Sequence, residues 1–289
     1  MESSVELNVS IIANPIKDPG YRVAIRAAEV LQGLGVRVLA GAELARELPQ
    51  GVCQACDDEL FQARFVVTLG GDGTILAAAR GAAGRAPLLG VNLGNKGFLT
   101  AVELPGMEEA LRLAVAGEGR VERRMMLSAA VYDAEGVQQG AVLALNDFYF
   151  SGVTTPRLVR VEAKVGDTLA GQYAADGLLV ASPTGSTGYS LSAGGPVVSP
   201  DVRCLLITPV CAHSLSAVPL VVPAESVITL TMIGNTNEAR LNADGEERAR
   251  LMKGWQVVVR KAAEDTLFLR FGSNDFFDLL RSKLTEWND

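Results

Sequence analysis

Residues 64–74, RFVVTLGGDGT, join an apolar run directly to a glycine-rich turn. The run RFVVTL has the β-branched and aromatic composition of a buried strand. Residues 74–83 are rich in helix formers. The glycines Gly70, Gly71 and Gly73 let the backbone approach a ligand closely, and the start of the helix adds partial positive charge. These residues predict a strand–turn–helix unit whose turn is suited to phosphate.

Asp72 is the unusual member of this turn, because a carboxylate repels phosphate. It is useful there if it binds Mg²⁺ or accepts a proton from an attacking hydroxyl. The alternative is an ordinary tight turn in which Asp72 caps the helix. The turn by itself leaves both interpretations open.

Alternating strand and helix patterns surround this unit. We predict strands over residues 5–13, 36–40, 64–69 and 87–91, and helices over residues 21–34 and 74–83. Parallel strands require crossovers, so this pattern indicates an α/β domain. A second glycine-rich turn, residues 90–99, follows the strand at 87–91. Carboxyl ends of neighbouring strands are where α/β proteins bind ligands.

The pattern changes near residue 124 to short apolar stretches separated by Gly, Asp and Asn, which predicts an all-β domain. The expected strands cover residues 127–132, 142–145, 158–165, 178–181, 205–208, 227–232, 255–260 and 266–271. Residues 116–122 are the expected link. Residues 274–287 have helical periodicity and an apolar face that needs a partner. The expected division is therefore 1–120 for the α/β domain, 121–272 for the all-β domain and 273–289 for a helix docking back.

A third segment, residues 176–196 (DGLLVASPTGSTGYSLSAGGP), is dominated by hydroxyls and glycines from Ser182 onward. Hydroxyls and exposed backbone groups can read the edge of a base, and Tyr189 offers a ring for stacking. A serine-rich surface loop is the alternative. The bulky Leu191 and Tyr189 argue against a mere linker.

Composition restricts the classes of function. The net charge is −7, with 26 Lys and Arg against 33 Asp and Glu, which disfavours a nucleic-acid binder. No apolar run is long enough to span a bilayer and no secretory signal is visible, so we expect a cytoplasmic protein without membrane contact. The four cysteines and single histidine (His213) do not form a metal-site pattern, so we expect free thiols and no protein metal site. A redox role of the C-x-x-C pair, Cys53 and Cys56, is the alternative.

The motifs resemble those of the NAD kinase family. Diacylglycerol-type lipid kinases and, more loosely, phosphofructokinases share the G-G-D-G-T turn. Residues 176–196 are similar to the signature D-G-x-x-x-x-T-P-T-G-S-T-A-Y with its S-A-G-G-P continuation, which selects NAD kinases. Residues 92–99 resemble N-x-G-x-x-G-F-L, and residues 208–216 resemble T-P-I-C-P-H-S-L-S. Asn146-Asp147 stands where the family has Asn-Glu, and residues 244–246 resemble its late D-G turn.

This resemblance implies a Rossmann-like amino-terminal domain, a β-sandwich carboxy-terminal domain, and transfer of the terminal phosphate of ATP to the adenosine ribose 2′-hydroxyl of NAD. It implies Mg²⁺ or another divalent cation with ATP, and a homodimer or homotetramer. Asp72 would be the catalytic base or orienting group. The other implied residues are Gly70, Gly71, Gly73 and Thr74 for phosphate; Asn146 and Asp147 for adenine and ribose; Thr184, Thr187 and Gly188 for the adenine end; and Asp176, Tyr189 and Ser192 for the nicotinamide side, across a subunit boundary. His213 would be structural or near the site, or a satisfied histidine beside the β core.

Several positions depart from the family pattern. Asp147 is one methylene shorter than the usual Glu, Gly188 replaces Ala, and Ser182 replaces Thr. Lys96 stands where an apolar residue is common. A lipid kinase and a non-catalytic NADP-binding regulator are the alternative functions. Inorganic polyphosphate as donor, NADH as acceptor, and feedback by NADPH are left open.

Overall fold

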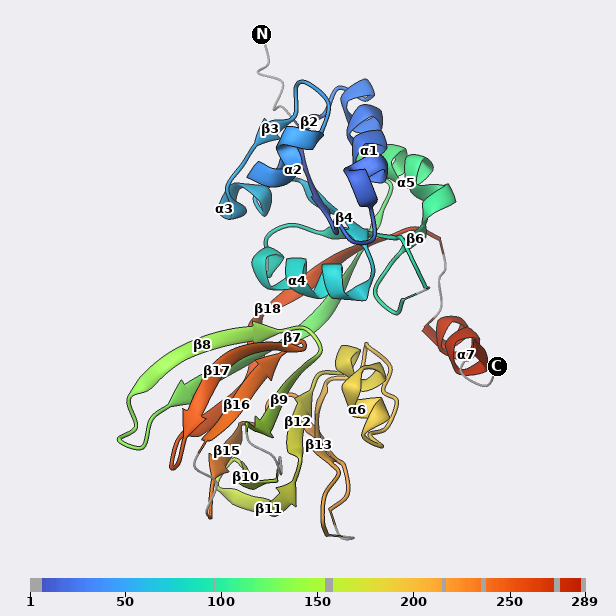
Figure 1. Cartoon of the computed structure of the whole chain (residues 1–289). Helices are drawn as coiled ribbons and strands as arrows, with labels where there is room; N and C mark the ends of the chain where they lie inside the picture. Colours follow the sequence, from blue (N-terminus) through green and yellow to red (C-terminus); the bar gives the residue numbers. More distant parts are fainter. Residues whose placement is uncertain are drawn as a thin grey trace. The chain divides into compact units, whose positions relative to one another are not determined.

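The computed structural model describes residues 7–95, 97–153, 158–214, 217–234, 238–272 and 276–286 (Figure 1). Lys96 and residues 273–275, where the predicted tail helix begins, lie outside this described part. The chain divides into two compact units. Unit 1 contains residues 1–123 and 266–289, and unit 2 contains residues 124–265. Strands β7 (Arg120–Tyr132) and β18 (Gln256–Arg270) each contribute residues to both units.

Unit 1 is built on a parallel sheet with the strand order β5-β4-β1-β2-β3. Strand β5 also pairs in parallel with β6 and, at Leu88 and Phe268, with the end of β18. The strands are β1 (Asn8–Ala13), β2 (Arg37–Ala40), β3 (Cys53–Gln54), β4 (Phe65–Gly70), β5 (Leu88–Asn92) and β6 (Val102–Glu103). The helices are η1 (Pro19–Tyr21), α1 (Arg22–Gly33), α2 (Ala42–Glu47), α3 (Asp57–Leu60), α4 (Asp72–Ala82), η2 (Leu104–Gly106), α5 (Met107–Ala116) and α7 (Phe276–Glu286).

Helices cover both faces of this sheet. Alternate residues of a strand face opposite sides, and Leu89 and Val91 of β5 belong to a buried cluster with α1 and α5. Gly90 therefore faces the other side, where a Cβ would come within 2.5 Å of Ile75 on α4. Strands β4 and β5 are buried along their whole length, as expected for strands covered on both faces.

Unit 2 is an antiparallel β structure. Six strands follow the order β14-β13-β12-β9-β16-β17. A second antiparallel group contains β11, β10, β15 and the first part of β18, and β7 pairs with β8. The bounds are β8 (Gln138–Ala144), β9 (Asp147–Gly152), β10 (Val159–Val165), β11 (Thr168–Ala175), β12 (Gly177–Ala181), β13 (Cys204–Val210), β14 (Leu220–Pro223), β15 (Ile228–Met232), β16 (Glu238–Ala243) and β17 (Glu246–Met252). Between β12 and β13 lie the short helices η3 (Thr184–Thr187) and α6 (Tyr189–Ser192).

The core of unit 2 lies between its two groups of strands. One buried cluster combines Phe148 and Phe150 of β9 with Val161 of β10 and Leu230 of β15. Side chains from both groups therefore interdigitate, which is sandwich packing. The predicted fold class, an α/β domain and a β-sandwich with a terminal helix, is confirmed.

The structure corrects some predicted elements. The two strands expected at 255–260 and 266–271 are one continuous strand, β18. Within the expected link at 116–122, α5 ends at Ala116 and β7 begins at Arg120, so only residues 117–119 lie outside helix and strand. The sequence analysis also missed β9, β11, β14, β16 and β17. In β11, β16 and β17 polar or charged residues alternate with apolar ones and weaken the apolar pattern. The domain boundaries and the docking of the terminal helix remain predictions.

Candidate active site

The G-G-D-G turn connects β4 to α4 in unit 1. Gly71 is the N-cap of α4, and its carbonyl accepts hydrogen bonds from the N–H groups of Thr74 (3.0 Å) and Ile75 (3.3 Å). Asp72 and Gly73 occupy the first helical positions, where amide N–H groups have no acceptor within the helix. A Cβ on Gly73 would meet no protein atom within 4 Å. The turn therefore leaves open space beside the positive end of a helix.

The carboxylate of Asp72 is held by the second glycine-rich turn. Its Oδ2 accepts from the N–H of Phe98 at 2.8 Å, and its Oδ1 accepts from the N–H of Leu99 at 3.1 Å. No side chain caps α4, so the interpretation of Asp72 as an ordinary helix cap is wrong. Each oxygen keeps a further lone pair for a substrate hydroxyl. The geometry thus gives a half-buried carboxylate of fixed orientation.

Lys17 is a candidate that sequence reasoning missed. Its Nζ would lie 2.5 Å from a Cβ on Gly71 and 3.1 Å from one on Gly94. The loop that carries it follows β1, and Asn14 shapes this loop by accepting from the N–H groups of Ile16 and Lys17. Three loops at the carboxyl ends of β1, β4 and β5 therefore meet around this amine. The position after a strand end is the signal that could have identified it.

Asn146 and Asp147 stand at the start of β9 in unit 2. Asp244 organises them, because its carboxylate accepts from the N–H groups of Leu145 (3.0 Å), Asn146 (2.7 Å) and Asp147 (3.3 Å). Asp244 itself has a left-handed φ of 50° at the β16–β17 turn. Asp244 of the late D-G turn therefore fixes the backbone at the start of β9, a role that the sequence analysis did not predict.

Asp147 is a buried carboxyl group. Loss of water around the carboxyl is the larger cause and the nearby charge of Asp244 the smaller, and together they raise the pKa of Asp147 to about 7. The Oδ1 atom of Asn146 is also buried and has no hydrogen-bond partner in the described part of the chain. Buried polar groups without hydrogen-bond partners indicate a ligand that supplies the missing partners.

The segment 184–188 packs against the same pair. Gly185 leaves no room for a side chain because a Cβ would overlap the carbonyl of Asn146. A Cβ on Gly188 would lie 3.4 Å from Nδ2 of Asn146 and 3.8 Å from Oδ2 of Asp147. Thr184 and Thr187 lie on η3, and the hydroxyl of Thr187 donates to the carbonyl of Thr184 (3.3 Å). The structure thus brings together the five residues expected at the adenine and ribose.

Asp176 and Tyr189 are linked through Tyr149, which the sequence did not single out. The rings of Tyr149 and Tyr189 meet edge to face with centroids 5.2 Å apart. The hydroxyl of Tyr149 donates to the carbonyl of Asp176 at 3.4 Å. Ser192 ends α6 and is exposed, and in the described part of the chain no hydrogen bond joins its side chain to these residues.

The remaining polar candidates have local structural partners. His213 is exposed, and its backbone N–H donates to Ala174, so its side chain lies outside the β core. Cys53 accepts from Nε of Arg37 at 3.3 Å, and the four cysteines are free thiols. Within the described ranges, no group of three or more His, Cys, Asp or Glu could hold a metal ion. No described helix is long and apolar enough to cross a membrane.

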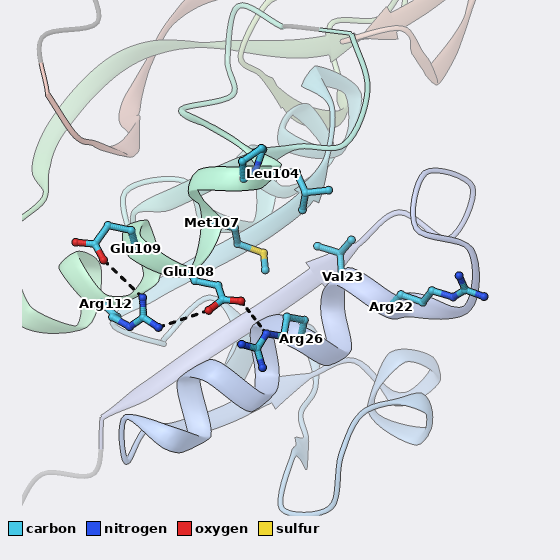
Figure 2. Close-up of a pocket in the computed structure, with 9 residues that line it drawn as sticks. Arg22, Val23, Arg26, Leu104, Met107, Glu108, Glu109 and Arg112 are labelled. Carbon is cyan, nitrogen blue, oxygen red and sulfur yellow. Dashed lines mark hydrogen bonds and ion pairs between the residues drawn. The ribbon is translucent and has the colours of Figure 1, made fainter.

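A groove of about 480 Å³ lies between α1 and α5, and none of the predicted site residues lines it. Figure 2 shows that most of its charged side chains pair with one another: Glu108 pairs with Arg26 at 2.8 Å and with Arg112 at 3.4 Å. Its lining is Arg22, Val23, Arg26, Leu104, Pro105, Met107, Glu108, Glu109 and Arg112. The groove therefore contains none of the residues that the motifs assign to phosphate, NAD or catalysis.

Comparisons with known proteins agree with the motifs. Residues 9–119 match the ATP-NAD kinase N-terminal domain, and residues 145–271 match the ATP-NAD kinase C-terminal domain. The chain is 42% identical over 279 residues to an NAD kinase of Heliobacterium modesticaldum, covering 96% of this chain and 98% of that one. It is 37% identical over 279 residues to an NAD kinase of Desulforamulus reducens, covering 96% and 94%.

Two solved structures share the fold. A yeast NADH kinase complexed with NADH superimposes with a TM-score of 0.90 at 25% identity, covering 97% of this chain and 88% of that one. An NAD kinase from Archaeoglobus fulgidus in complex with ATP gives a TM-score of 0.76 at 26% identity, covering 96% and 99%.

Proposed function

The chain belongs to the NAD kinase family and phosphorylates NAD to NADP with ATP, and we propose that Asp72 orients and deprotonates the adenosine ribose 2′-hydroxyl. The observation that carries this proposal is the carboxylate of Asp72, fixed by the N–H groups of Phe98 and Leu99. A positioned carboxylate contributes about 10²- to 10⁴-fold as a general base. Relatives that are 42% and 37% identical to this chain are NAD kinases, which favours this function over the lipid kinase and regulator interpretations.

The phosphates of ATP bind the turn after β4. We assign phosphate binding to Gly70, Gly71, Gly73 and Thr74. Gly71 and Gly73 lie at the start of α4, the hydroxyl of Thr74 lies beside Gly70, and Lys17 adds a positive charge beside Gly71. Gly73 supports this role, because neither its φ nor a neighbouring atom of the protein requires glycine there. A phosphate oxygen that approaches the backbone would require it.

The nucleoside acceptor binds the residues of unit 2. Asn146 and Asp147 hold adenine and ribose, together with Thr184, Thr187 and Gly188. The unpartnered Oδ1 of Asn146 is an acceptor suited to the exocyclic amine of adenine. Asp176, Tyr189 and Ser192 take the nicotinamide side, and the Tyr149–Tyr189 pair offers it an aromatic surface.

A divalent cation, Mg²⁺ in the first instance, enters with ATP. The described residues contain no cluster of three or more acidic, His or Cys ligands, which fits a cation held mainly by phosphate oxygens and water. Such a cation supplies charge neutralisation on the transferred phosphate. With the phosphate charge neutralised by the cation, the task left to the protein is to hold the acceptor hydroxyl in line with the transferred phosphate.

The cellular location and assembly are further proposals. The free cysteines support a reducing compartment, the cytoplasm. Tyr189 is 44% exposed and Ser192 is exposed, which supports a homodimer or homotetramer that completes the nicotinamide side. Light scattering coupled to size-exclusion chromatography, with and without NADP, tests the assembly.

The activity and the donor are tested together in one assay. Purified protein is mixed with NAD, Mg²⁺ and either ATP or inorganic polyphosphate, and NADP is detected with an NADP-specific dehydrogenase. NADP that forms with ATP and stops without Mg²⁺ supports the proposal. In the same assay Asp72→Asn tests the catalytic residue, since wild-type turnover in a folded variant contradicts its role.

A further inference from the structure

We propose that Arg270 is a positioning residue for phosphoryl transfer, acting through Leu99 to hold the carboxylate of Asp72 in place. The inference rests on the role proposed above for Asp72. Arg270 is the last residue of β18, and its guanidinium donates from Nη1 to the carbonyl of Leu99 at 2.9 Å. The N–H of the same Leu99 donates to Oδ1 of Asp72 at 3.1 Å. One residue is thus held from both sides.

The guanidinium is itself fixed by its surroundings. Its Nε pairs with Oε2 of Glu122 at 2.9 Å, and its centre lies 4.8 Å from the centroid of the Phe268 ring. The side chain of Arg270 is only 9% exposed, and that of Glu122 is 16% exposed. Burying two charges is costly unless their geometry is good. A planar fork that reaches a carboxylate and a carbonyl together is a property of arginine that lysine does not share.

Loss of this fork has a defined consequence at the site. Without Arg270, the backbone at Leu99 loses the hydrogen bond to its carbonyl and is free to shift. The N–H of Leu99 then moves away from Asp72, which loses one of the two donors that fix its carboxylate. A displacement of about 1 Å from the reactive geometry costs about 100-fold in rate. Binding of NAD and ATP does not depend on this carboxylate orientation in the same way. The expected signature is a fall in kcat with little change in KM.

The first test measures kcat and KM for Arg270→Lys and Arg270→Met. We expect kcat to fall about 10- to 100-fold in both, with KM for NAD and ATP within about threefold of wild type. Arg85→Met is the matched control, because Arg85 also pairs with a carboxylate (Asp58, 3.0 Å), donates to a carbonyl (Gly81, 3.0 Å) and lies over a ring (Phe61, 5.6 Å). Its partners do not contact Asp72, so wild-type kcat is expected.

The second test is a double-mutant cycle with Asp72→Asn. If Arg270 acts through Asp72, Arg270→Lys lowers kcat in the wild type but adds no further loss in the Asp72→Asn background. A purely structural role gives the same fold-loss in both backgrounds and overturns the inference. Unchanged kcat in the folded Arg270 variants also overturns it. If Arg270→Met does not fold, Arg270→Lys and Glu122→Gln carry the comparison, and thermal melting verifies their folding.

The Asp72→Asn variant alone separates the two proposals. Wild-type turnover in that variant removes the role of Asp72, and this inference with it. An inactive Asp72→Asn variant beside fully active Arg270 variants removes the inference only.

Discussion

Gly97 lies directly against the carboxylate of Asp72, so that a Cβ at Gly97 would overlap Oδ1 and come within 2.6 Å of Cγ. Phe98 and Leu99, the next two residues, donate the N–H groups that hold this carboxylate. The close approach is possible only because Gly97 has no side chain. Glycine at position 97 therefore makes room for the carboxylate of Asp72, in addition to shaping the turn.

Gly97→Ala tests this relationship. The added methyl group forces Asp72 or the turn to move, so we expect kcat to fall about 100-fold while the protein remains folded. Gly140→Ala on β8 is the control, because a Cβ there meets nothing within 4 Å. The measurement is steady-state kcat for Gly97→Ala and Gly140→Ala. Equal kcat values for the two variants would show that the Asp72 carboxylate tolerates displacement.

Lys17→Met tests the amine above the G-G-D-G turn. Loss of a positive charge that contacts phosphate raises the KM for ATP about tenfold or more and lowers kcat, because the charge also stabilises the transferred phosphate. The control is Lys253→Met, which removes the same charge from an exposed position in unit 2. If both variants keep the wild-type KM for ATP, Lys17 does not bind phosphate.

The buried carboxyl of Asp147 makes stability depend on pH. Burial first, and the charge of Asp244 second, raise the pKa of Asp147 from 3.8 to about 7. Between these values the folded protein keeps a proton that the unfolded chain has released. The contribution of Asp147 to the free energy of unfolding therefore falls as pH rises through this window. Each pH unit within it changes the contribution by up to about 1.4 kcal/mol.

Asp147→Asn removes this dependence. We expect the melting temperature of the variant, relative to wild type, to rise by several degrees between about pH 5 and pH 8. Comparing the two proteins at each pH cancels the other titrating groups. A difference that stays constant across the range would mean that Asp147 ionises as easily in the folded protein as in the unfolded chain.

Tyr189→Ala tests the aromatic surface of unit 2. The variant loses the edge-to-face contact with Tyr149 and the exposed ring, so the KM for NAD rises by about 3- to 10-fold while the KM for ATP is unchanged. Tyr189→Phe keeps the ring and is expected to retain the wild-type KM. An equal KM for NAD in wild type and both variants would mean that the nicotinamide half of NAD does not contact Tyr189.

Local sequence was sufficient for elements with a strong pattern. The strand before the G-G-D-G turn and the helix after it were predicted because their composition and glycines agree with their burial. The two strands expected in place of β18 show where the pattern fails. Lys261, Glu264 and Asp265 interrupt the apolar alternation, yet the strand continues from Gln256 to Arg270. An exposed strand segment tolerates charges that a local pattern treats as a break.

Two hydrogen bonds that the sequence did not predict join residues far apart in the chain. Arg270 reaches Leu99 across 171 positions of sequence, and Asp244 reaches Asn146 across 98. Contacts between residues so far apart produce no local periodicity or motif spacing that could be recognised in the sequence. Asp72, by contrast, could be proposed from the sequence because the glycines of its own turn are adjacent to it in the chain.

A single-turnover measurement is the sharpest test of the proposed role of Asp72 in the chemical step. Enzyme in excess over NAD is mixed with ATP and Mg²⁺, and NADP formed is quantified after rapid quenching, for wild type and Asp72→Asn. Excess enzyme removes product release from the observed rate. We predict a fall of about 10²- to 10⁴-fold in the single-turnover rate with NAD binding retained. A rate within about threefold of wild type would contradict the assignment of Asp72 as the catalytic base.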